Sequence, residues 1–205
     1  MSTTVEQITP VCAFHGESLF WDERDSCLRW VDMLKGDVLS LSKKGETDCT
    51  HIGYIAAAIR PRAAGGVVAS LERRFAIIEH DGTVHSHPDL WADANIRMND
   101  GACDPQGRFY CGSMAYDEAP GYGVLYRLDP DKSVSVVLRE LGISNGLAWL
   151  NAGDEAMFVD SLTQRIDILA FNDEEGTFYS RRTLAIVNEE DGMPDGIALD
   201  VEDGV

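Results

Sequence analysis

One short pattern recurs along the chain and constrains its fold more than any other feature. It begins with an acidic or amide residue, continues through small or apolar residues, and ends five positions later at a residue that opens a turn. The first positions of its copies are spaced by 39, 43, 46 and 50 residues. Four copies carry an oxygen-bearing first residue and one carries alanine; they are Glu17–Asp22, Ala56–Pro61, Asn99–Asp104, Asn145–Leu150 and Asp195–Asp200.

A repeat of this length, with strand-length alternating runs between turn residues, is typical of a β-propeller. The first repeat predicts strands over residues 18–21, 28–32 and 37–41, followed by an outer strand after Glu46. No long segment has the periodicity of a helix, so we expect few helices. The first position of each copy should open the innermost strand of a blade. These side chains should therefore meet in the central channel.

The length of the chain limits how much of such a ring it can form. At about 45 residues per blade, the 205 residues supply four blades and the opening of a fifth at Asp195. We therefore predict an all-β, C-terminally incomplete propeller, with one domain over residues 1–205. Unclosed strand edges invite pairing, so self-association is a further expectation.

Composition excludes several classes of partner. The chain is 44% hydrophobic, which is ordinary for a globular protein, and its formal net charge is −18. Nucleic acid and anionic membranes are therefore poor partners. Neither a secretory signal nor an apolar run long enough to span a bilayer is visible. The five cysteines form no Cys-x-x-Cys pair, so we expect a reducing, cytoplasmic location and no thiolate zinc site.

Three of the repeated positions can bind a metal ion. Glu17, Asn145 and Asp195 offer two carboxylates and an amide, a donor set that suits Ca²⁺, Mg²⁺ or Mn²⁺ and is less suited to Zn²⁺. The alternative is that each is a turn residue, because Asn-Gly and Asp-Gly pairs commonly form turns. Glu17 is not followed by glycine, so that alternative does not explain it.

Arg97, close to the second copy of the oxygen-bearing pattern, is a candidate for substrate binding. Its fork-shaped, permanently charged guanidinium suits the orientation of a polyol or of an oxyanion. The alternative for Arg97 is a salt bridge with one of the many acidic residues. Asp100, which precedes Gly101, is more simply explained as a turn residue.

Five motifs occur in a fixed order from Glu17 to the end of the chain. They are Gly16-Glu-Ser18 with Trp21-Asp22, Arg97-Met-Asn-Asp-Gly101 with Asp104-Pro105, Ile143-Ser-Asn-Gly-Leu147, Val159-Asp-Ser161 and Met193-Pro-Asp-Gly196. In content and order they resemble the regucalcin (senescence marker protein)/gluconolactonase family. The resemblance implies a six-bladed propeller whose last two blades are not in this chain. It also implies a metal-dependent hydrolase that opens a sugar 1,4- or 1,5-lactone to its aldonic acid.

The resemblance also implies a role for individual residues. Glu17, Asn145 and Asp195 match the ligands of one divalent cation, and Asp195 matches the proton donor or acceptor in ring opening. Arg97 and Asn99 match substrate-binding positions. Where animal members have a substrate-contacting glutamate, this chain has Asp117, one methylene shorter. The alternative function is a metal-binding or protein-interaction propeller without turnover.

Overall fold

The computed structural model describes residues 4–205; residues 1–3, the start of the predicted domain, lie outside it. This part of the chain is all-β, with three short 3-10 helices, η1 (Met33–Lys35), η2 (Ser161–Thr163) and η3 (Glu189–Asp191). None of its helices has the length and apolar character of a membrane span. The strands are β1 (Gly16–Asp22), β2 (Cys27–Asp32), β3 (Asp37–Ser42), β4 (Thr47–His51), β5 (Ala56–Pro61), β6 (Val67–Leu71), β7 (Phe75–Ile78), β8 (Val84–Ser86), β9 (Ile96–Cys103), β10 (Phe109–Ala115), β11 (Gly123–Leu128), β12 (Val134–Leu141), β13 (Ser144–Trp149), β14 (Glu155–Asp160), β15 (Arg165–Asn172) and β16 (Thr177–Ile186).

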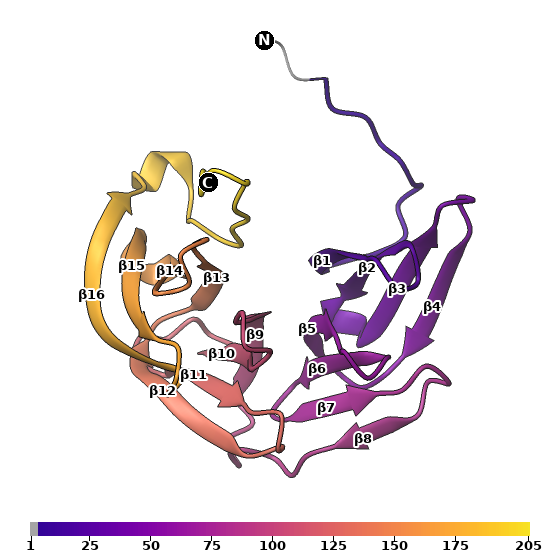
Figure 1. The fold of residues 1–205 in the computed structure, drawn as a ribbon, viewed down its shortest axis with the longest axis horizontal. Coiled ribbons are helices and arrows are strands. Elements are labelled where there is room, and N and C mark those ends of the chain that lie inside the picture. The colour runs from indigo at the N-terminus through magenta and orange to yellow at the C-terminus, as the bar shows by residue number, and fades with distance from the viewer. Residues whose placement is uncertain (1–3) are drawn as a thin grey trace.

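The strands form four four-stranded antiparallel sheets, each made of consecutive strands. The sheets are arranged around a common centre, which β1, β5, β9 and β13 face (Figure 1). This is a β-propeller-like arrangement, as the repeat predicts. The strands predicted in the first repeat correspond to β1, β2 and β3, and the outer strand to β4. The first position of each of the first four repeats therefore lies on an innermost strand.

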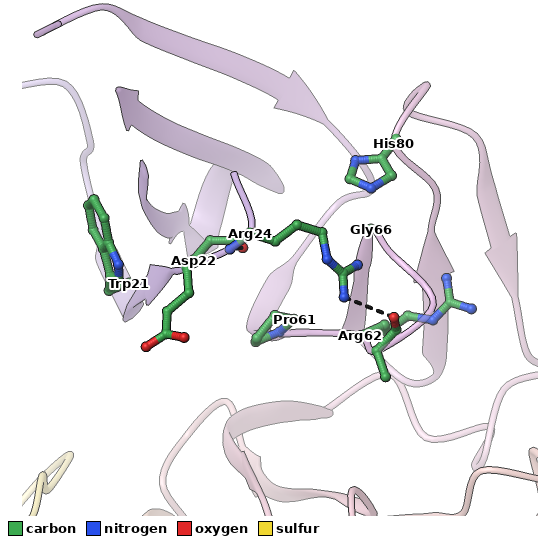
Figure 2. Close-up of a pocket in the computed structure, with 9 residues that line it drawn as sticks. Trp21, Asp22, Arg24, Pro61, Arg62, Gly66 and His80 are labelled. Carbon is green, nitrogen blue, oxygen red and sulfur yellow. Dashed lines mark hydrogen bonds between the residues drawn. The ribbon is translucent and has the colours of Figure 1, made fainter. Parts of the chain in front are cut away.

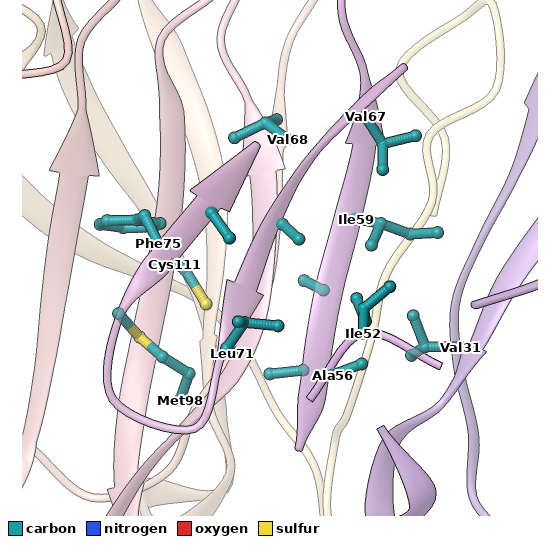
Figure 3. Packing of buried hydrophobic residues seen from close by; sticks show 14 of the residues in the cluster. Val31, Ile52, Ala56, Ile59, Val67, Val68, Leu71, Phe75, Met98 and Cys111 are labelled. Carbon is teal, nitrogen blue, oxygen red and sulfur yellow. The ribbon is translucent and has the colours of Figure 1, made fainter. Parts of the chain in front are cut away.

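The core lies between neighbouring sheets rather than within any one of them. On the inner strand β5, Ala56, Ala57 and Ala58 are at most 1% exposed. Small side chains fit there because an innermost strand is covered on both faces by its neighbours. One cluster joins the first three sheets, and Figure 3 shows Ile59, Phe75 and Met98 within it. A second cluster joins the third and fourth sheets.

Each innermost strand has a register irregularity beside its repeated position. In β1 the pairing with β2 shifts between Glu17 and Phe20, and in β13 the pairing shifts between Ser144 and Leu147. β5 and β9 have corresponding shifts. A bulge rotates the following side chains and increases the local twist of the strand. The four bulges therefore set the direction of the side chains that open the inner strands.

Two expectations differ from the structure. Among residues 4–205 no strand follows β16 (Thr177–Ile186), so the segment that begins at Asp195 is irregular. An inner strand is held by pairing with the next strand of its own sheet, and this segment has no such partner. The Asp100-Gly101 and Asn145-Gly146 pairs lie inside β9 and β13 rather than in turns.

Candidate functional site

A small cavity of about 160 Å³ lies where the innermost strands begin. Its walls come from the starts of β1, β9 and β13, from the residues that follow β2, β10 and β14, and from the C-terminal segment. Segments far apart in sequence therefore share one cavity. The lining residues are His15, Glu17, Met33, Arg97, Asn99, Asp100, Met114, Glu118, Ile143, Asn145, Ser161, Met193, Pro194 and Asp195.

The structure brings five of the six predicted site residues to this cavity: Glu17, Arg97, Asn99, Asn145 and Asp195. Asn99 and Asn145 are both buried, each 8% exposed, whereas Asp195 is exposed. An exposed carboxylate beside buried amides can exchange protons with water while the amides stay fixed. The cavity thus combines two buried amides with one exposed carboxylate.

Hydrogen bonds connect the polar side chains of β9 and β13. Arg97 Nη1 donates to Asn99 Oδ1 at 2.8 Å, and Asn99 Nδ2 donates to Asn145 Oδ1 at 3.3 Å. The other hydrogen bonds of Arg97 go to the Met98 carbonyl and the Met33 sulfur, which are neutral acceptors. Its guanidinium also lies over the Tyr116 ring. Neutral groups therefore hold Arg97 in place, and among the described residues no carboxylate accepts a hydrogen bond from it. Its charge is thus available to a ligand.

Asp117 is the predicted site residue that the structure does not bring to the cavity. Its carboxylate instead accepts the backbone N–H of Ala119 at 3.2 Å, as expected for an Asp in a tight turn. The next residue, Glu118, lines the cavity. Glu118 has a φ of +59°, an unusual conformation for a residue other than glycine. The turn therefore directs Glu118 rather than Asp117 toward the site.

Negative charge accumulates around the cavity. Burial and the nearby charges of Asp195 and Asp100 raise the pKa of Glu17 to about 7, although Arg97 opposes the shift. Burial also raises the pKa of Asp100. The charge of Asp195 adds to this increase, and the charge of Arg60 opposes it. Crowded carboxylates favour a bound cation, because a cation relieves their repulsion.

This charge predicts a pH dependence in the absence of metal. Unfolded Glu17 ionises near its ordinary pKa of 4.5, whereas folded Glu17 keeps its proton up to about 7. Between these values the native state binds more protons, so the free energy of unfolding should fall as pH rises. Urea denaturation in chelator, at about pH 5 and about pH 7.5, measures this fall. It should be smaller in Glu17→Gln, and an equal fall in both proteins would contradict the prediction.

The donor set fits a hard divalent cation. Glu17, Asn145 and Asp195 supply oxygen atoms to one cavity, and carboxylate and amide oxygens are the ligands that such ions prefer. Among the described residues no three His, Cys, Asp or Glu side chains gather in a metal-binding arrangement. The candidate set has only two such side chains, because its third oxygen belongs to the Asn145 amide.

A larger cavity, of about 690 Å³, lies at the C-terminal ends of β1 and β5. Figure 2 shows Trp21 and Asp22 at the end of β1, Pro61 at the end of β5, and His80 on the opposite side of the cavity, near Gly66. Arg24 reaches across this cavity and donates to the Ala63 carbonyl at 2.8 Å. None of the predicted site residues lines it. The chemistry predicted from the repeat is therefore confined to the start of the strands.

Ser161 and Glu118 are among the polar lining residues to which the sequence assigned no role. Ser161 belongs to a motif of the resemblance, yet a serine after Val-Asp has no distinctive chemical signal. Glu118 follows the expected position by one residue, and a positive φ at glutamate is not predictable from sequence. Both depend on turns that only the folded chain defines.

The family is shown by direct comparison. A family model described as the SMP-30/gluconolactonase/LRE-like region matches residues 15–205. The chain belongs to this family. It is 33% identical over 193 residues to regucalcin of Danio rerio, a match that covers 91% of this chain and 65% of that protein. It is 30% identical over 212 residues to regucalcin of Homo sapiens, covering 98% of this chain and 70% of that protein.

Solved structures of the family have the same fold. A luciferin-regenerating enzyme superposes with a TM-score of 0.85 at 29% identity, covering 93% of this chain and 67% of that chain. A gluconolactonase from Xanthomonas campestris superposes with a TM-score of 0.76 at 22% identity, covering 92% and 67% respectively. At that identity the second likeness concerns the fold alone. The chain thus spans about two thirds of the family members that it matches.

Proposed function

We propose that this family member carries the site of a divalent-cation-dependent lactonase, which hydrolyses a sugar 1,4- or 1,5-lactone to its aldonic acid. The observation that best supports the proposal is the convergence of Glu17, Asn145 and Asp195, with Arg97 and Asn99, on one cavity of about 160 Å³. The family to which the chain belongs, described as the SMP-30/gluconolactonase/LRE-like region, supports the same reaction class.

The residues divide the chemistry between them. A divalent cation held by Glu17, Asn145 and Asp195 would polarise the lactone carbonyl and lower the pKa of a water molecule. Asp195, the exposed member of the set, accepts a proton from the attacking water and returns one to the ring oxygen as the ester C–O bond breaks. Arg97, oriented by Asn99, donates hydrogen bonds to substrate oxygens and to the developing oxyanion.

Removal and return of the cation tests the proposal. Hydrolysis of glucono-1,5-lactone by the purified chain, followed by acid release in a weak buffer, should stop on addition of chelator. It should resume with an excess of at least one of Ca²⁺, Mg²⁺, Mn²⁺ and Zn²⁺. A hydrolysis rate that chelation does not change would contradict the cation dependence. Cation binding without any turnover would favour a non-catalytic propeller instead.

Substitutions of Glu118 and of Asp117 should differ in how much they change the KM for a lactone. We expect Glu118→Ala to raise KM about tenfold, the loss of one hydrogen bond to a charged group, because Glu118 lines the cavity. Asp117→Ala should change KM by less than about twofold, because its carboxylate caps the Ala119 N–H. Steady-state kinetics with one lactone measures both. The reverse order of effects would restore Asp117 as the substrate contact.

A further inference from the structure

Ser161 links two of the candidate cation ligands through one hydroxyl group. It is the first residue of η2, follows β14, and is 2% exposed. Its Oγ donates to the Pro194 carbonyl at 2.7 Å and accepts Asn145 Nδ2 at 2.8 Å. Asn145 is itself a candidate ligand, and Pro194 directly precedes another, Asp195.

The chemistry of these groups fixes the direction of the hydrogen bonds. A serine hydroxyl has one proton, and a backbone carbonyl can only accept. The proton of Ser161 is therefore given to Pro194, which leaves only acceptor lone pairs for Asn145. The Asn145 amide must present its NH₂ group to Ser161 and its oxygen to the cavity, where Asn99 Nδ2 also donates to that oxygen at 3.3 Å. Rotation of the amide by half a turn would place two acceptors against each other.

The same hydroxyl restrains the segment that carries Asp195. Residues 193–199 have no strand partner among the described residues, where the bond from Ser161 to the Pro194 carbonyl is their one hydrogen bond. The segment packs against β13 at Gly146, where an added Cβ would lie 2.8 Å from the Asp195 carbonyl oxygen. Close packing therefore holds the segment against β13, and the Ser161 hydrogen bond ties it at Pro194.

We propose that Ser161 is a positioning residue for the cation site: its hydroxyl turns the Asn145 oxygen toward the cation and holds Asp195 beside it. This rests on the proposed function, because it assigns the cation to these ligands. Groups that orient metal ligands commonly change metal affinity by about 10- to 100-fold when removed. Ser161 has no contact with the cation in this proposal and acts through its two neighbours.

Cation affinity measured by titration calorimetry with Mn²⁺ or Ca²⁺ tests the proposal, with unfolding temperature in chelator as the second readout. Ser161→Ala should bind the cation about 10- to 100-fold more weakly than the wild-type chain. Ser161→Thr, which keeps the hydroxyl, should restore most of the affinity. Ser113→Ala is the matched control, because Ser113 is fully buried and its hydroxyl bonds only the Val124 backbone. It should alter stability without altering affinity.

The outcomes distinguish a failure of the role of Ser161 from a failure of the proposed function. Unchanged affinity in Ser161→Ala, beside a wild-type chain that binds the cation, would overturn the role of Ser161 alone. Equal losses in Ser161→Ala and Ser113→Ala would also overturn it, since the effect would then be general destabilisation. No cation binding by the wild-type chain would instead overturn the proposed function.

A cation-free measurement tests the restraint on residues 193–199. In chelator, limited proteolysis should cleave this segment faster in Ser161→Ala than in the wild-type chain or in Ser113→Ala, because the Pro194 carbonyl has lost its donor. Equal cleavage rates in the three proteins would overturn the part of the proposal that concerns Asp195.

Discussion

Asp195→Asn is expected to lower kcat for lactone hydrolysis by about 10³-fold, within the range for loss of a general acid–base group. Asparagine keeps the shape of the side chain and one oxygen that can bind a cation, but it cannot accept a proton near neutral pH. The cation affinity should therefore fall much less than kcat. Measuring both on the same preparation separates proton transfer from cation binding.

Asp191→Asn provides the matched control for that experiment. Asp191 lies four residues earlier, is exposed in η3, and bonds only the side chain of Asn188 and backbone groups of its own turn. It should leave both kcat and cation affinity unchanged. If Asp195→Asn retained full turnover, the proton-transfer role would belong to another group in the cavity.

Asp104→Ala is expected to produce the largest loss of stability, about 3–5 kcal/mol, as for other buried ion pairs that lose one partner. The Asp104 side chain is 0% exposed and pairs with Arg108, which is 7% exposed. Arg108 Nη2 also donates to the Asp173 carbonyl at 2.6 Å, so the pair connects the third sheet to the fourth. Loss of the Asp104 carboxylate would leave the buried Arg108 guanidinium without its counter-charge.

Urea denaturation monitored by tryptophan fluorescence measures this loss. Glu155→Ala is the control, because the Glu155 and Arg182 side chains of that ion pair are 34% and 60% exposed. Exposed pairs contribute less than about 1 kcal/mol. Similar losses in Asp104→Ala and Glu155→Ala would show that the Asp104 pair is compensated by water or by its neighbours.

The repeat and the fold were predictable from sequence because they depend on local patterns. Strand-length alternation between turn residues predicts the strands, and a fixed interval predicts that equivalent positions face one centre. The oxygen donors Glu17, Asn145 and Asp195 could be selected for the same reason, since they occupy equivalent positions. Blade number and closure remain predictions that rest on the family resemblance.

The glycines next to these donors were harder to interpret. Asn145-Gly146 has the composition of a turn, yet it lies inside β13. Gly146 is required there because the C-terminal segment passes close to it, with the Asp195 carbonyl oxygen 2.8 Å from the position of an added Cβ. A contact between residues 49 positions apart in the chain leaves no local signal.

The sequence by itself determined which side chains open the inner strands, because strand periodicity and repeat spacing are properties of the chain. Only the tertiary structure decided where those side chains point and what orients them. The bulges at Glu17 and Asn145, the positive φ that directs Glu118 rather than Asp117 to the cavity, and the Ser161 hydroxyl between Asn145 and Pro194 all depend on backbone geometry. That geometry is fixed by packing between sheets, and a shift of one residue in a turn or bulge redirects a side chain completely.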